Sequence, residues 1–487
     1  MKYVTEGYEP KIALQYFEEL AAIPRGSRNE EAAAKFVEEK AKSFGYYVRR
    51  DEYNNVVVKI PATPGYENVE PICLQAHLDM VNEKNADSTH DFEKDGLDLY
   101  IDGDWLKANG TTLGCDDGYG CAFMLALMDE EGKTFVHPEL ECIFTTGEEI
   151  GFVGAMPMDC SDIRARRMIG MDGGPEGVTC ATSAGAMEVK MYVTPDYEAA
   201  KGEGVSIFVS GLIGGHSAGC ITFERANSNK VMGRILHNVR KVCDFRIANI
   251  VGGLMFNAIP RENRCEIVIT DGNKEKAIEK INRVAAEIKA EYRASDPDIT
   301  VEISDCSPEK MMSARASKAI TEIMYNVPNG VRMMNVEVPG LPVTSTNMGI
   351  VKEVDGRIMV DTMLRSSSRT CNDDYVDNIC SVATLAGAEE CYVGYWMPAW
   401  PYEAKSYMRD IYLDLYKSKT GKEAKVNYVH GGLELGVFSE KMPGMQIVTI
   451  GVDAFDAHTV TERMSLSSFK RVFEFLKEYI TEVTKRG

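Results

Sequence analysis

Histidine and acidic residues that follow apolar runs are the feature that most constrains the fold of this chain. His77 follows one such run, the pair Glu148-Glu149 follows another, and Asp172 follows a third. Short apolar runs bounded by polar and glycine residues are typical of buried strands. A helical pattern begins near Asp117, and strands that alternate with helices predict an α/β fold. We therefore expect these side chains at the strand ends of an α/β sheet.

The chain is too long for one ordinary core. At 487 residues, two or more domains are expected. The α/β pattern of the first part returns after about residue 401, and a different order of strands and helices lies between. We expect one α/β domain formed by residues 1–187 and 401–487, interrupted by an inserted α+β domain over residues 188–400.

Hydrophobic periodicity locates several elements. It predicts helices near 12–23 and 33–44, strands at Tyr47–Arg50 and Val56–Ile60, and a C-terminal amphipathic helix. The apolar stripe of that last helix consists of Phe469, Val472, Phe473, Leu476, Ile480 and Val483.

Composition excludes some partners and indicates a compartment. The 54 basic and 74 acidic residues give a net charge of -20, which argues against nucleic acid and anionic membrane as partners. The N-terminal residues lack the features of a signal peptide, and we find no apolar stretch of membrane-spanning length. The 13 cysteines are scattered and never in CxxC spacing, so we expect a reduced, cytoplasmic protein without structural disulfides.

The polar motifs also have chemical meaning. A histidine at a strand end can offer one ring nitrogen to a metal, and Asp79, two residues after His77, can hold the other nitrogen. Of two adjacent glutamates, one can bind metal while the other takes a proton from water. Each motif has an ordinary alternative: a helix N-cap for Asp116, a solvated loop for Glu148 and Glu149, and a turn for Asp172. Their joint occurrence favours a two-metal hydrolase.

These motifs together resemble a known family. They include His-Leu-Asp-Met (77–80), Gly-Glu-Glu (147–149), Met-Asp-Gly (171–173), Gly-Gly-His-Ser (214–217) and Ala-His (457–458). The chain resembles the co-catalytic zinc peptidases, which include aminoacylases, carboxypeptidase G and carnosinases. Within that family it looks most like the bacterial aminoacyl-histidine dipeptidases (Xaa-His dipeptidase, peptidase D). The resemblance covers nearly the whole chain.

The resemblance implies a fold and a metal centre. The fold would be a catalytic domain with a central mixed sheet flanked by helices, interrupted by a lid and dimerisation domain. Asp116 would bridge two zinc ions, and manganese or cobalt could replace zinc. Its other ligands would be His77 and Asp172 for one ion, and Glu149 and His458 for the second.

The resemblance also implies roles around the metals. Glu148 would be the general base, and Asp79 the partner of His77. His216 would stabilise the oxyanion, in this active site or in that of a dimer partner. Asn257, Arg365 and His430 would contact the substrate, although a hydrogen-bonded loop histidine is the alternative for His216 and His430.

Some positions depart from the family pattern. Asp117 stands where asparagine is usual; it could tighten metal binding, shift the acidity of metal-bound water, or cap the helix. The loop after His216 and the residues after His458 also differ, although Glu462 has its expected place. The resemblance implies a homodimer that hydrolyses small peptides, with Xaa-His dipeptides as the first expectation. An aminoacylase, a tripeptidase and a catalytically silent metal-binding protein are the alternatives.

Overall fold

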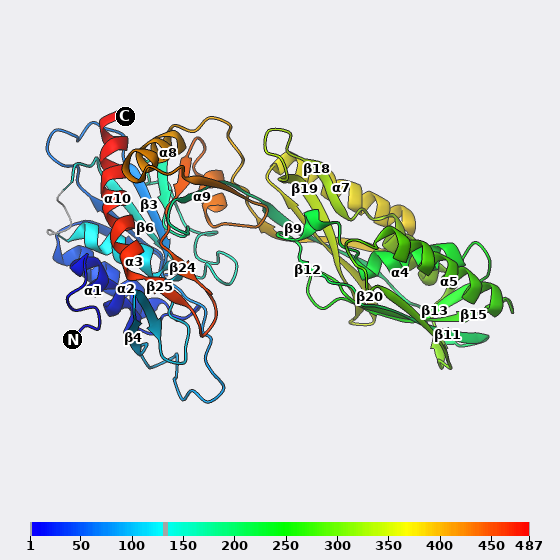
Figure 1. Ribbon diagram of the computed structural model, residues 1–487. Coiled ribbons are helices and arrows are strands. Elements are labelled where there is room, and N and C mark those ends of the chain that lie inside the picture. Colours follow the sequence, from blue (N-terminus) through cyan, green and yellow to red (C-terminus); the bar gives the residue numbers. More distant parts are fainter. Residues whose placement is uncertain (1, 130–134, 487) are drawn as a thin grey trace. The chain divides into compact units, whose positions relative to one another are not determined.

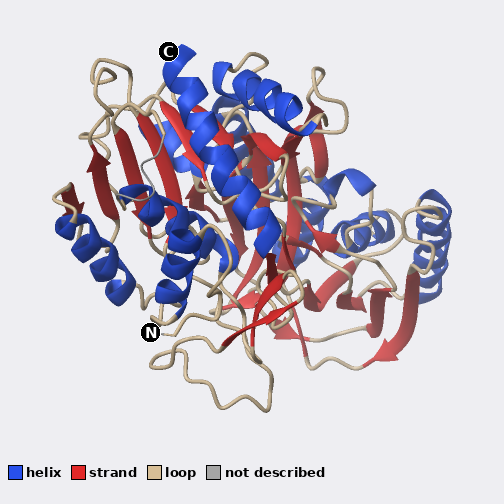
Figure 2. Cartoon of the chain, turned by 60° about the vertical axis from the view of Figure 1, so that its left-hand side comes forward, coloured by secondary structure: helices blue, strands red, loops and turns tan. Residues whose placement is uncertain are grey.

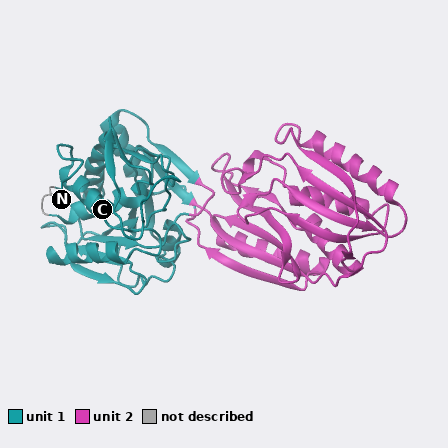
Figure 3. Cartoon of the chain, turned by 90° about the horizontal axis from the view of Figure 1, so that it is seen from below, with its two compact units in different colours: residues 1–182, 402–428, 433–487 teal, residues 183–401, 429–432 magenta. Residues whose placement is uncertain are grey.

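The computed structural model describes residues 2–129 and 135–486, and contacts within it divide the chain into two compact units. Unit 1 consists of residues 1–182, 402–428 and 433–487, and unit 2 of residues 183–401 and 429–432 (Figure 3). The domain limits expected from the sequence stay a prediction. All 13 cysteines are free thiols.

Unit 1 is built around a six-stranded mixed sheet in the order β1-β2-β6-β3-β7-β23. Four strands, β6, β3, β7 and β23, are parallel to one another. Strand β2 is antiparallel to both of its neighbours, β1 and β6. Their bounds are β1 Tyr47–Arg50, β2 Val56–Ile60, β3 Ile72–His77, β6 Leu140–Thr145, β7 Arg167–Gly170 and β23 Gln446–Thr449. Every residue of β3 and β6 is buried, as expected for parallel strands that helices cover on both faces.

Helices flank this sheet (blue in Figure 2). Helix α3 is almost entirely buried and packs on β3, whereas the C-terminal helix α10, red in Figure 1, packs against α8. The predicted apolar stripe of α10 is buried throughout, which confirms that element. The helices are α1 Lys11–Ala21, α2 Glu31–Ser43, α3 Cys115–Met128, α8 Tyr407–Thr420, α9 Leu435–Lys441 and α10 Leu466–Arg486.

Two smaller sheets complete unit 1. One has the order β24-β25-β5-β4, and the other pairs β22 with β8. The bounds are β4 Leu99–Asp102, β5 Trp105–Ala108, β8 Val178–Ser183, β22 Lys425–Val429, β24 Ala454–Phe455 and β25 Arg463–Ser465. The loop of the hairpin β24-β25 contains His458, one of the metal ligands expected from the sequence.

Unit 2 is built on a nine-stranded sheet in the order β16-β11-β15-β13-β19-β20-β9-β21, with β18 also paired to β19. All of its strand pairs are antiparallel. The strands are β9 Gly185–Val193, β11 Glu203–Ser210, β13 Phe245–Gly252, β15 Asn263–Ile269, β16 Thr300–Cys306, β18 Gly330–Met334, β19 Pro342–Val354, β20 Arg357–Ser366 and β21 Glu390–Met397.

Four helices supply much of the apolar core of unit 2. They are α4 Ser228–Val239, α5 Lys274–Glu291, α6 Ala314–Asn326 and α7 Arg369–Ala386. Minor elements are β10 Glu198–Ala199, β12 Gly215–His216, η2 Ile221–Phe223, β14 Ala258–Ile259 and β17 Lys310–Met311. The expected plan, a mixed-sheet α/β domain and an α+β insertion, agrees with this architecture.

Candidate metal centre

Three neighbouring parallel strands bring candidate ligands to one edge of the sheet in unit 1. His77 is the last residue of β3, which lies between β6 and β7. Glu148 and Glu149 follow β6, and Asp172 follows β7. Because the carboxyl ends of parallel strands meet at the same edge, residues far apart in the sequence come together there.

Asp116 lies at the centre of the group. Its two carboxylate oxygens face different histidines: Oδ1 is 3.0 Å from His77 Nε2, and Oδ2 is 3.2 Å from His458 Nε2. Asp116 has extended backbone angles, φ −82° and ψ 106°, so the regular helix begins only after it. This conformation directs the carboxylate away from the helix and between the two imidazoles.

His458 reaches the group from the hairpin loop between β24 and β25. Its Nε2 is 2.8 Å from Glu149 Oε1, in addition to its contact with Asp116. The side chain is 47% exposed, and the backbone has a positive φ of 64°. A residue other than glycine is strained in that conformation, so the surrounding loop must hold it there.

The donor atoms form two sets that share Asp116. His77, Asp116 and Asp172 form one set, and Asp116, Glu149 and His458 form the other; within each, the atoms lie within 4.8 Å of one another. His77, Glu148 and Glu149 form a third such group. The structure therefore brings together all five residues that the sequence analysis expected to bind metal, with Glu148 beside them.

Asp79 connects His77 to the two glutamates. Its Oδ1 is 3.4 Å from His77 Nδ1 and accepts a hydrogen bond of 3.0 Å from the backbone N–H of Glu148. Its Oδ2 accepts one from the N–H of Glu149 at 3.3 Å and one from the Ser27 hydroxyl at 2.8 Å. The buried carboxylate thus orients the imidazole and fixes the glutamate loop.

The ionisable side chains of this group crowd negative charge into a buried space, and this changes their pKa values. Burial and the nearby Asp116 carboxylate raise the pKa of Asp172 to about 7, and burial raises that of Glu148 well above its usual range. Hydrogen bonds to Asp116 and Glu149 raise the pKa of His458 to about 10. Without cations, protons on the imidazoles and carboxyl groups have to offset the crowded acidic charge.

The donor set fits two divalent cations. Asp116, Asp172 and Glu149 offer carboxylate oxygens and His77 and His458 offer ring nitrogens, and divalent ions bound to them would offset negative charge that protons otherwise neutralise. Mixed imidazole and carboxylate donors suit zinc, manganese or cobalt. The residues at this edge of the sheet therefore fit a pair of metal ions.

Asp117 has the helix-capping role that the sequence analysis left open. Its Oδ1 accepts a hydrogen bond of 3.2 Å from the backbone N–H of Gly120, in the manner of an N-cap. Burial raises its pKa well above the usual range. Asp117 therefore caps the helix that follows it.

The remaining candidates lie in unit 2. The buried Arg365 on β20 has its Nε 3.3 Å from Ser217 Oγ. His430 is buried and its Nε2 lies 2.7 Å from Ser345 Oγ, which matches the hydrogen-bonded alternative. Burial and the charge of Arg365 lower the pKa of His430 to about 4.

His216 and Asn257 lie on neighbouring segments of unit 2. His216, on β12, is exposed and pairs in register with Ala258, the residue after Asn257. Burial of part of the ring and the charge of Arg365 lower the pKa of His216. His216 and His430 thus both favour the neutral form beside this guanidinium.

Sequence reasoning gave no role to Glu434. It is buried, and its Oε2 accepts hydrogen bonds from Gln75 Nε2 at 2.7 Å and Thr145 Oγ1 at 2.6 Å. It therefore joins β3 and β6 just before the residues they present to the site. The motif His-Gly-Gly-Leu-Glu (430–434) was the available signal, but it does not reveal which strands the carboxylate contacts.

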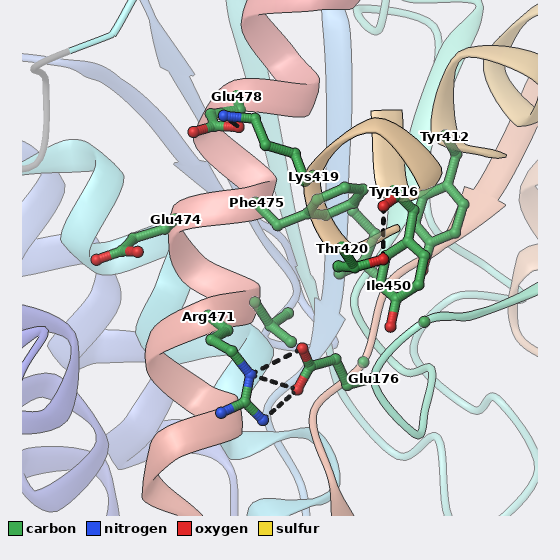
Figure 4. A pocket seen from close by; sticks show the side chains of 13 residues that line it. Glu176, Tyr412, Tyr416, Lys419, Thr420, Ile450, Arg471, Glu474, Phe475 and Glu478 are labelled. Carbon is green, nitrogen blue, oxygen red and sulfur yellow. Dashed lines mark hydrogen bonds and ion pairs between the residues drawn. The ribbon is translucent and has the colours of Figure 1, made fainter. Parts of the chain in front are cut away.

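A separate cavity of about 330 Å³ lies beside the loop that follows Asp172. Figure 4 shows the Glu176 carboxylate facing the Arg471 guanidinium, with contacts of 2.6 to 3.1 Å. The rings of Tyr412 and Tyr416 also line the cavity. The ion pair holds the end of the Asp172 loop against α10.

Within the described ranges, no helix combines the length and apolar character that crossing a membrane requires.

Two sets of metal donors that share one aspartate, at the ends of parallel strands, are typical of metal-dependent hydrolases. The chain belongs to Peptidase family M20/M25/M40, whose sequence profile matches residues 73–482. This confirms the family resemblance found in the sequence.

Known peptidases are similar to this chain in sequence or in structure, which agrees with its membership of the family. The chain is 32% identical over 477 residues to the cytosol non-specific dipeptidase of Escherichia coli (strain K12), covering 97% of this chain and 98% of that protein. Aminoacylhistidine dipeptidase from Vibrio alginolyticus has a similar structure, with a TM-score of 0.92, 31% identity and coverage of 99% and 98% of the two chains. The aminopeptidase PepT from Bacillus cereus, with a TM-score of 0.57, 16% identity and coverage of 98% and 99%, shares the fold.

Proposed function

We propose that this protein is a metal-dependent dipeptidase. The observation that carries the proposal is the position of Asp116, whose two oxygens face His77 and His458 within sets of donors that suit two cations. The names of the Escherichia coli and Vibrio alginolyticus relatives support dipeptides as substrates. Xaa-His dipeptides are the first expectation, and aminoacylase and tripeptidase activities are the alternatives.

Five residues hold the metal ions in this proposal. Asp116 is shared, His77 and Asp172 complete one site, and Glu149 and His458 complete the other. Zinc is the expected metal, and manganese or cobalt would fit the same donors. When bound, the ions act as Lewis acids that lower the pKa of water and polarise the substrate carbonyl.

Glu148 moves the proton in the proposed reaction. One of its carboxylate oxygens takes a proton from the attacking water and then gives it to the nitrogen of the leaving amine. Its neighbours support this role, because Asp79 accepts the N–H groups of both Glu148 and Glu149 and thereby fixes the loop. The raised pKa of Glu148 suits a group that must both accept and donate a proton near neutral pH.

The residues of unit 2 are proposed to recognise the substrate. Arg365 offers a planar guanidinium for the terminal carboxylate, and Asn257 an amide for the carbonyl. His216 is proposed to stabilise the oxyanion, and His430 to contact the substrate. Homodimerisation and a cytoplasmic location are further parts of the proposal.

A panel of substrates tests the function. The metal-free enzyme and the enzyme restored with zinc, manganese or cobalt would be offered β-alanyl-histidine, glycyl-histidine, leucyl-glycine, a tripeptide and an N-acetyl amino acid. We expect metal-dependent cleavage confined to the dipeptides. Preference for the tripeptide or the acylated amino acid would contradict the substrate class but keep the metal chemistry. Stoichiometric metal binding without turnover of any compound would favour the silent scaffold.

A further inference from the structure

Glu462 makes an unusual set of hydrogen bonds in unit 1. Its carboxylate accepts the backbone N–H groups of three successive residues: Leu113 at 2.8 Å, Gly114 at 3.0 Å and Cys115 at 2.9 Å. The thiol of Cys115 is also 2.9 Å from Glu462 Oε1. The side chain is only 2% exposed. Converging N–H groups form a concave anion-binding turn, and here a carboxylate of the same chain occupies it.

Arg25 holds the same segment through its carbonyl groups. The guanidinium Nη2 donates to the carbonyl oxygen of Gly114, while Nη1 donates to those of Leu78 at 2.9 Å and Asp79 at 3.2 Å. Gly114 is needed at this point because its φ is +63° and an added Cβ would lie 2.7 Å from Arg25 Nη2. The residues directly before Asp116 are therefore fixed by Arg25 and Glu462 together.

Glu462 also ends the loop that carries His458. Its backbone N–H donates to the carbonyl oxygen of Thr459, and the next residue begins β25, which pairs with β5. Glu462 therefore belongs to the His458 loop by sequence, and its carboxylate binds the Asp116 loop. These two loops supply two of the three donors in the set Asp116, Glu149 and His458.

His458 depends on such a connection more than the other donors do. His77 is fully buried at the end of a strand, whereas His458 is half-exposed on a hairpin loop with a positive φ. If the Glu462 carboxylate were lost, three buried N–H groups would lose their acceptor and the two loops would lose their connection. The effect should therefore concentrate on the metal ion that His458 helps to hold.

We propose that Glu462 is a positioning residue that couples the His458 loop to the Asp116 loop and thereby sets the affinity for the second metal ion. This inference rests on the proposed function, because it assumes that Asp116, Glu149 and His458 hold a metal. Residues that orient metal ligands typically contribute 10- to 100-fold to metal affinity.

The test is a titration of the metal-free protein with Co²⁺. Binding is monitored by calorimetry and by visible absorption. We expect wild type to bind two equivalents. Glu462→Gln should bind the first with nearly unchanged affinity and the second about 10- to 100-fold more weakly, with a changed Co²⁺ spectrum. The glutamine amide keeps the size of the side chain but turns a donor toward the N–H groups.

Glu18→Gln is the matched control. Glu18 is likewise 2% exposed, and it accepts the N–H groups of Val4 at 2.8 Å and Thr5 at 2.7 Å, together with the Thr5 hydroxyl. It holds the N-terminal segment rather than the residues before Asp116. We expect this variant to lose thermal stability but to bind both equivalents of Co²⁺ as wild type does.

Other outcomes would decide against the inference or its premise. Equal affinities for the second Co²⁺ in wild type and Glu462→Gln would overturn the inference alone. Failure of wild type to bind Co²⁺ would contradict the proposed function itself. If Glu462→Gln does not fold, Glu462→Asp, which keeps the charge on a shorter side chain, should still weaken the second site; wild-type affinity in that variant would also overturn the inference.

Discussion

The two units place buried charged groups by different means. In unit 1, acidic residues follow three adjacent parallel strands and meet at one edge of the sheet. In unit 2, the buried Arg365 lies within an antiparallel pair, opposite Ser345, which itself contacts His430. Parallel topology gathers side chains from strand ends, whereas antiparallel topology gathers them across neighbouring strands.

The sign of the charge differs as well. Unit 1 concentrates carboxylates that need cations, and unit 2 buries a guanidinium beside two histidines that favour the neutral form. A buried charge is costly unless it has a partner of opposite sign. The contrast is what the proposed function requires, in which carboxylates of unit 1 hold the metal ions and Arg365 of unit 2 binds the substrate carboxylate.

The largest effect is expected from Glu148→Gln in unit 1. The amide cannot accept the proton from water, so kcat should fall about 10²- to 10⁴-fold while KM changes little. Steady-state kinetics with a cleaved dipeptide would measure this, and Co²⁺ titration should still give two equivalents. Near-wild-type turnover with both metals bound would remove Glu148 from the role of base.

Metal removal should affect the two units unequally. Chelation would leave the acidic group of unit 1 without its cations, so this unit should lose about 3 kcal/mol of stability for each metal ion removed, relative to protein at a metal concentration of about 100 Kd. Hydrogen exchange detected by mass spectrometry should show faster exchange in peptides containing β3, β6 and β7. Peptides containing β19 and β20 are the internal control, and an equal change in both units would contradict the division of roles.

Arg365→Gln should act on binding rather than on chemistry. Loss of a charged hydrogen-bond donor typically costs about 1.5–3 kcal/mol, so KM should rise roughly 10- to 100-fold with a smaller change in kcat. Arg357→Gln is the matched control, because Arg357 lies on the same strand, is 38% exposed and pairs with Glu390. A fall in kcat at constant KM would place Arg365 in the chemical step instead.

The smallest effect concerns the pH dependence of unit 2. Burial and the adjacent Glu188 raise the pKa of Asp361 to about 8, against an ordinary value near 4, and Lys190 and Lys352 only partly oppose this. Between about pH 4 and pH 8, the unfolded chain releases the Asp361 proton that the folded chain retains. The contribution of protonated Asp361 to stability is therefore lost as the pH rises from about 4 to 8.

Asp361→Asn removes this titration and can still donate to Glu188. Its melting temperature relative to wild type should therefore increase by roughly 5 °C between pH 5 and pH 8. Thermal unfolding followed by circular dichroism at both pH values would measure the difference. A difference that stays constant with pH would show that Asp361 does not titrate in this range.

Part of the site could be predicted because three of its donors follow strand-like apolar runs, whereas His458 has no such pattern and the metal-binding role of each donor was implied by the family resemblance. His77 ends a mostly apolar run, Asp172 comes directly after another, and Glu149 comes four residues after a third; the topology of parallel strands then brings them together. The strands Tyr47–Arg50 and Val56–Ile60 and the C-terminal helix were likewise readable from periodicity, and the structure confirms them.

The supporting contacts could not be predicted in the same way. Glu462 binds residues about 350 positions earlier in the chain, and Glu434 contacts Gln75 and Thr145, which lie 359 and 289 positions earlier. No local pattern specifies which backbone groups such a carboxylate will accept. For Asp117, the sequence offered three roles, and only the contact with Gly120 distinguished the helix cap.

The order of the donors along the chain has a consequence for biosynthesis. Residues 183–401 contain almost all of unit 2, whereas unit 1 still lacks α10, His458 and Glu462 when that stretch leaves the ribosome. Unit 2 can therefore acquire its core during translation, while the metal donors are complete only after residue 458 has emerged. A nascent chain that stops before residue 458 cannot assemble the full proposed catalytic centre, so translation itself delays the proposed activity until that histidine has been added.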